Sequence, residues 1–133
     1  MRPESEALIT SARAQQLLQA AVSANFSEDE RAEFAHKACV WYADAYLKLA
    51  DSARAKKGLL SRTPDRELAR KAFDALCGDL ITAHNSLGSD SWDFIRKFGG
   101  RILPALADCI SLMKEVGLDG QQMEAERLRG LLT

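Results

Sequence analysis

Apolar residues recur every three or four positions along most of the chain, and this spacing constrains the fold more than any other feature. Phe34, Ala38, Tyr42, Leu49 and Ala53, for example, share one side of a helix. An amphipathic helix buries such a stripe against a neighbouring element. The sequence has no alternating runs of β-branched residues, the pattern that predicts strands. The chain is therefore expected to be all-α.

Capping residues and glycines divide this pattern into five helices. Ser27 and Glu30 make a capping-box motif, the strongest start signal in the sequence. Pro3 opens an earlier helix, and Thr63 followed by Pro64 opens a later one, because proline is favoured in a first helical turn. The expected helices cover approximately residues 3–24, 28–57, 64–87, 91–116 and 120–131. Such long helices with short connections predict an antiparallel four-helix bundle with a short fifth C-terminal helix, in one domain over residues 1–133.

The fourth predicted helix contains an interruption. Gly99, Gly100 and Pro104 lie within it, although the apolar spacing stays in phase on both sides. Proline has no backbone donor and its ring obstructs the preceding turn, so the helical hydrogen bonds are expected to break near Gly99–Pro104. The sequence predicts a fourth helix that is kinked or broken there, and the kinked form is favoured over two separate helices.

The composition is that of an ordinary globular protein. Of the 133 residues, 47% are hydrophobic and 28% are charged, and the formal net charge is −1. These values fit neither a disordered chain nor a membrane-spanning one. No apolar run reaches the roughly 18 residues that a membrane helix needs, and the N-terminus lacks the basic-then-apolar order of a signal peptide. A cytoplasmic protein of a bacterium-like cell, without a membrane partner, is expected.

The three cysteines are expected to be core residues. Cys39, Cys77 and Cys109 are odd in number, far apart, and each falls on the apolar side of its helical pattern. Free cysteine in such a position behaves as a small hydrophobe. No Cys-x-x-Cys or Cys-x-x-His pair supports metal binding. The sequence therefore predicts no disulfide, no metal and no cofactor.

One short stretch, RAEFAH from Arg31 to His36, carries the residue types of two kinds of active site. A di-iron bundle needs carboxylates from four helices and Glu-x-x-His from two of them. Here Glu33 with His36 is the single match, since Ile81 stands three positions before His84. The ligand count therefore argues against iron.

Arg31 and His36 also have the Arg-x4-6-His spacing, and in this the chain resembles the HEPN superfamily of small helical bundles. The resemblance covers this motif and the bundle architecture. It implies a metal-independent ribonuclease in which His36 moves a proton at the 2′-hydroxyl and Arg31 stabilises charge on the phosphate. The remaining interpretation is a plain amphipathic turn, with Phe34 in the core and Glu33 paired to Lys37 on the surface. That interpretation is favoured.

A basic segment follows the second predicted helix. Seven basic residues stand between positions 54 and 71 against two acidic ones, and a pair of leucines lies among them. The helix end, loop and helix start bring these residues to one end of the bundle, which we name the basic tip. It comprises Arg54, Lys56, Lys57, Leu59, Leu60, Arg62, Arg66, Arg70 and Lys71. An apolar pair ringed by cations suits an acidic partner, and simple solvation of the charges is the alternative.

These features favour a non-enzymatic interaction module. The expected partner is another protein, bound as by an adaptor, antitoxin, immunity protein or accessory subunit; a homodimer also fits the sequence. The alternative is a HEPN-like protein that binds or cleaves RNA through Arg31 and His36. Leu8 and Ile9 fall off the apolar stripe of the first helix, which makes them a second candidate contact. The basic run has no interleaved aromatic residue for stacking on bases.

Overall fold

The computed structural model describes residues 2–56 and 63–133, and every regular element in them is helical. The predicted contacts Lys57, Leu59, Leu60 and Arg62 lie outside the described residues. The elements are α1 (Pro3–Ala21), α2 (Glu28–Ala55), α3 (Arg66–Phe73), the π-helical turn η1 (Asp74–Gly78), α4 (Asp79–Leu87), α5 (Asp90–Phe98), α6 (Ile102–Val116) and α7 (Asp119–Leu132). The predicted all-α class is confirmed.

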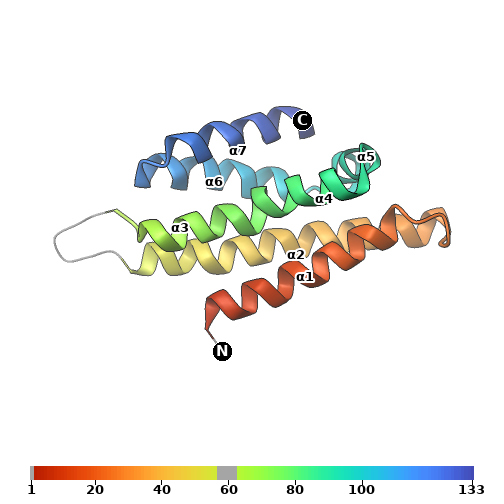
Figure 1. Ribbon diagram of the computed structural model, residues 1–133, viewed down its shortest axis with the longest axis horizontal. Coiled ribbons are helices and arrows are strands. Elements are labelled where there is room, and N and C mark those ends of the chain that lie inside the picture. The colour runs from red at the N-terminus through yellow and green to blue at the C-terminus, as the bar shows by residue number, and fades with distance from the viewer. Residues whose placement is uncertain (1, 57–62) are drawn as a thin grey trace.

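The long elements run back and forth along one axis (Figure 1). α1 and α2 form an antiparallel pair, and the continuous path of α3, η1 and α4 returns alongside α2. α6 and α7 form a second antiparallel pair on the other side of that path, while α5 lies across one end. Two details differ from the predicted four helices with a short fifth. The predicted fourth helix is divided into α5 and α6, and the C-terminal helix α7 is not short, because it has 14 residues against 15 in α6.

Two helix starts show how local chemistry fixes the boundaries. The capping box is confirmed: the Glu30 amide donates to the Ser27 hydroxyl, and the Ser27 amide donates to the Glu30 carboxylate, both at 3.2 Å. The predicted cap at Thr63 is wrong. Asp65 caps α3 instead, because its Oδ1 accepts from the Leu68 amide at 2.9 Å. An acidic side chain is also favourable at that end of the helix dipole.

The predicted interruption is present as a break between two helices, so the favoured kink is wrong. α5 ends at Phe98 and α6 begins at Ile102. The break falls at Gly99, the C-cap of α5, and not at Pro104. A Cβ atom at Gly99 would lie 2.4 Å from the Ile95 carbonyl oxygen, whereas Pro104 sits in the first turn of α6, where a missing donor costs no helical bond.

The core forms where small and large side chains alternate between packed helices. Many alanines on α1 and α2, such as Ala14 and Ala38, are fully buried and allow close approach. The rings of Tyr42 and Tyr46 fill the space between elements. Cys39, Cys77 and Cys109 are buried and free, as predicted. None of the described helices combines the length and hydropathy needed to cross a membrane.

Candidate functional site

Arg31 and His36 both contact α5. The Arg31 guanidinium carbon lies 5.0 Å from the centre of the Phe94 ring, and His36 Nδ1 lies 3.4 Å from the Phe98 carbonyl oxygen. Arg31 also donates from Nε to the Ala21 carbonyl at 2.7 Å. This bond satisfies a carbonyl at the end of α1 and ties it to the start of α2. Arg31 therefore has a structural role that accounts for its position.

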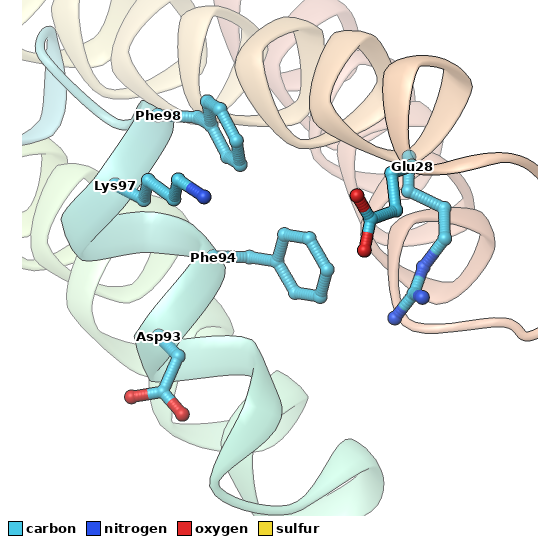
Figure 2. A pocket seen from close by; sticks show the side chains of 6 residues that line it. Glu28, Asp93, Phe94, Lys97 and Phe98 are labelled. Atoms are coloured by element: carbon cyan, nitrogen blue, oxygen red, sulfur yellow. The ribbon is translucent and has the colours of Figure 1, made fainter.

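A pocket of about 270 Å³ lies between α2 and α5. Figure 2 shows the Phe94 and Phe98 rings projecting from α5 with the Glu28 carboxylate opposite them. This α2–α5 pocket is lined by Glu28, Arg31, Asp93, Phe94, Lys97 and Phe98. Its two cations are matched by two carboxylates, so it concentrates no positive charge for a phosphate. The start of α2 adds further acidic residues beside it.

The basic tip is partly engaged within the fold. Arg54 forms an ion pair with Asp108 at 2.9 Å, and Lys71 forms one with Glu4 at 2.8 Å. Within the described residues, the remaining cations of the tip are exposed: Lys56, Arg66 and Arg70. A partner-binding role for the basic tip stays a prediction, and Arg54 and Lys71 contribute less free charge to it than the sequence suggests.

A second concave site lies between α1 and the π-helical turn, with α2 beneath it. Its volume is about 270 Å³, and it combines apolar side chains with three carboxylates and one lysine. We name it the α1–η1 groove. Its lining residues are Glu4, Ala7, Leu8, Ser11, Leu49, Lys71, Asp74, Ala75 and Asp79. Ligand sites commonly pair an apolar lining with a few convergent polar groups in this way.

The π-helical turn places two of these carboxylates on the groove. The Asp79 amide donates to the Asp74 carbonyl, five residues earlier, where an α-helix would use a spacing of four. Residues five apart in such a turn lie nearly above one another, so Asp74 and Asp79 face the same side. π-turns within α-helices occur frequently at functional sites.

Desolvation disfavours the charged forms of both carboxylates, although Asp74 itself is an exposed residue. Burial raises the pKa of Asp79, the nearby Ser11 hydroxyl lowers it, and the charge of Asp74 raises it further. Burial also raises the pKa of Asp74, with Arg70 acting in the opposite direction and Glu67 adding to the rise. Raised carboxyl pKa values in a cleft are typical of binding and catalytic sites.

Part of this groove could be predicted from the sequence. Leu8 and Ile9 were expected off the core stripe, and their exposed fractions of 72% and 43% confirm this. The pairing of Asp74 with Asp79 had no signal, because α-helical spacing separates them by about 140°. Gly78 fell outside the apolar stripe, but a glycine at that position does not by itself predict a π-turn.

The described parts of the chain contain no group of three or more His, Cys, Asp or Glu side chains that could hold a metal ion. Comparison of the chain with protein-family models, with curated proteins and with solved structures finds no match.

Proposed function

We propose that the protein is a non-enzymatic helical module that binds another protein in the cytoplasm. The observation that carries the proposal is the exposure of Leu8 at the edge of the α1–η1 groove. Its exposed fraction is 72%, yet it belongs to the lining of a concave site. An isolated exposed leucine is ordinary on a protein surface. An exposed leucine that borders a groove with polar side chains has the arrangement of a protein interface, in which an apolar centre is surrounded by polar groups.

The groove is better suited to binding than to catalysis. Its polar groups are carboxylates, one lysine and one serine, and Lys71 is already held by Glu4 at 2.8 Å. A nucleophilic mechanism would need a base in contact with the serine and an orienting partner for that base. Ser11 has a carboxylate neighbour, but the lining supplies no histidine.

The basic tip is the second surface in this proposal. Lys56, Arg66 and Arg70 are exposed and lie at the end of α2 and along α3. Exposed cations of this kind speed association with an acidic surface and set its orientation more than they add affinity. The tip and the groove share Lys71, so one partner can cover both.

RNA cleavage is the less supported alternative. Arg31 and His36 both lie on α2 and contact α5, which suits the HEPN-like interpretation. However, the Arg31 Nε donates to the Ala21 carbonyl. His36 is not among the residues that line the α2–α5 pocket, and the carboxylates of Glu28 and Asp93 offset the two cations there. Replacing His36 with Ala should leave RNA turnover by the purified protein unchanged; its loss in that variant would support the alternative.

Affinity capture with a matched pair of variants tests the proposed function. The tagged chain is incubated with nuclease-treated lysate, and Leu8→Glu is compared with Met123→Glu on α7. Met123 is a fair control because its exposed fraction, 69%, is close to that of Leu8. We expect a stoichiometric protein partner with the wild type and with Met123→Glu, and its loss with Leu8→Glu. Absence of any stoichiometric partner, or equal capture by both variants, would contradict the proposal.

A further inference from the structure

The α1–η1 groove holds two carboxylates, Asp74 and Asp79, and the charge of Arg70 partly offsets that of Asp74. Among residues 2–56 and 63–133, neither Asp74 nor Asp79 forms an ion pair. The lysine in the lining does not serve them, because Lys71 Nζ lies 2.8 Å from Glu4 Oε2. Two like charges that face one side of a helix repel each other, and a cation between them would remove that repulsion.

The rest of the groove suits an aliphatic stem. Ala7, Leu8, Leu49 and Ala75 provide apolar surface beside the carboxylates. The cavity volume of about 270 Å³ lies just below the range of about 300–1,000 Å³ that is typical of small-molecule sites. A group of side-chain size therefore fits better than a larger ligand.

A buried hydroxyl lies within electrostatic reach of Asp79, although its residue, Tyr42, does not line the groove. Tyr42 is fully buried, and its hydroxyl has no hydrogen-bond partner in the described part of the chain. The charge of Asp79 contributes to raising the pKa of this hydroxyl, so the two groups lie within electrostatic reach. A buried polar atom without a partner is costly and is uncommon in folded proteins.

We infer that the α1–η1 groove is a docking site for a lysine or arginine side chain of the partner protein, with its cationic head between Asp74 and Asp79 and its aliphatic stem against Leu8. Charge complementarity selects this occupant, because the lining has three carboxylates and one lysine, and a neutral or acidic side chain would leave this excess of negative charge in place. Lysine and arginine carry an apolar stem with a charged end, and the groove offers both apolar side chains and carboxylates. This inference rests on the proposed function and specifies the chemistry of its partner.

Two small probes that differ in charge test the groove without any partner. Nα-acetyl-lysine amide and Nα-acetyl-norleucine amide share an aliphatic stem, and the lysine probe alone carries an ammonium group. Each is titrated into the ¹⁵N-labelled full chain while amide chemical shifts are followed. We expect saturable shifts at Leu8, Ser11 and Asp79 with the lysine probe, and affinity lower by about tenfold or more with the norleucine probe.

Variants then connect the binding to the two carboxylates. The double variant Asp74→Asn with Asp79→Asn should lower affinity for the lysine probe about tenfold. Asp51→Asn, which changes an exposed carboxylate on α2, should leave it unchanged. The amide spectra also report whether each variant is folded. Equal affinity for both probes, or no effect of the double variant, would overturn the inference.

The outcomes separate this inference from the proposed function. If the lysine probe binds as expected but affinity capture yields no partner, the chemistry of the groove stands and the interaction module is wrong. If a partner is captured through Leu8 and its binding is unchanged by Asp74→Asn with Asp79→Asn, the module stands and the cation site is overturned.

Discussion

Arg54 of α2 and Asp108 of α6 form a two-point ion pair. Arg54 Nη1 donates to Asp108 Oδ2 at 2.9 Å, and Nη2 donates to Oδ1 at 3.1 Å. The Tyr46 hydroxyl donates to the same Oδ2 at 2.6 Å. Tyr46 is fully buried, so one carboxylate satisfies both a core phenol and a guanidinium at the surface. Bidentate, charge-assisted bonds of this type are among the strongest that side chains make.

Replacing Asp108 with Ala should lower the free energy of unfolding by about 1–3 kcal/mol, because it leaves the buried Tyr46 hydroxyl without an acceptor. Urea unfolding followed by circular dichroism measures the change. Glu33→Ala is the control: it breaks a pair with Lys37 in which both side chains are more than half exposed, and it should cost about 0–0.5 kcal/mol. Similar losses in the two variants would show that the α2–α6 network contributes no more than a surface pair.

A larger residue at Gly99 should destabilise the protein, whereas a larger residue at Gly100 should be tolerated. A Cβ atom at Gly99 would lie 2.4 Å from the Ile95 carbonyl oxygen and 3.1 Å from Cys39 Sγ, whereas nothing lies within 4 Å of one at Gly100. Gly99→Ala should therefore destabilise the protein by about 1–3 kcal/mol, and Gly100→Ala should change stability by less than about 0.5 kcal/mol. Thermal unfolding compares them. Equal melting temperatures would mean that the break between α5 and α6 can shift at little cost.

The three thiols should react slowly in the folded protein. Cys39, Cys77 and Cys109 are buried, and burial raises the pKa of the Cys39 thiol to about 12. The reacting species is the thiolate, which is scarce below such a pKa. We expect modification by a disulfide reagent at pH 8 to be slower by about a hundredfold or more than in concentrated urea. A thiol that reacts rapidly in the native state would place it outside the core.

The apolar stripes predicted the core because burial follows periodicity when a helix packs on one side only. The stripe of α2, including Tyr42, Tyr46 and Leu49, is buried as its spacing indicates. The capping box at Ser27 and Glu30 was equally readable, since all its atoms belong to four consecutive residues. Features whose interacting residues are close together in the chain could therefore be predicted from the sequence.

The ion pairs were harder to predict from the sequence, because the two residues of each pair are distant in the chain. Arg54 and Lys71 count as basic residues of a local run, yet they pair with Asp108 and Glu4, 54 and 67 positions away. The register shift at the π-turn depends on packing against neighbouring helices, so Asp74 and Asp79 gave no periodic signal. Local charge counts therefore overestimate the free charge of the basic tip.

Reversing charge at the basic tip should weaken partner binding with little change in stability. Lys56→Glu with Arg66→Glu inverts two exposed side chains, and isolated surface charges contribute only about 0–1 kcal/mol to folding. The affinity loss should shrink with added salt, since exposed charges are screened beyond about 8 Å at physiological ionic strength. Lys114→Glu with Arg129→Glu, on α6 and α7, is the control. Partner affinity that is unchanged by the first pair would assign the interface to the α1–η1 groove alone.

Neutralising Asp79 should stabilise the protein at pH 7. The pKa of Asp79 is raised in the folded state, chiefly by burial and further by the charge of Asp74, so folding disfavours its ionised form. A carboxyl whose folded pKa exceeds its unfolded value contributes stability below the unfolded value, near pH 3.9, and loses it as pH rises through the folded value. Asp79→Asn should therefore raise the melting temperature by about 1–4 °C at pH 7.

The pH dependence of that gain distinguishes an electrostatic origin from better packing. At pH 3 the carboxyl is protonated in both the folded and the unfolded chain, so the gain from Asp79→Asn should vanish. Asp51→Asn, at an exposed position on α2, should change the melting temperature little at either pH. A gain of equal size at pH 3 and pH 7 would point to packing. A loss at pH 7 would mean that the ionised Asp79 is already compensated within the fold, and the groove would then have no need of a cation from a partner.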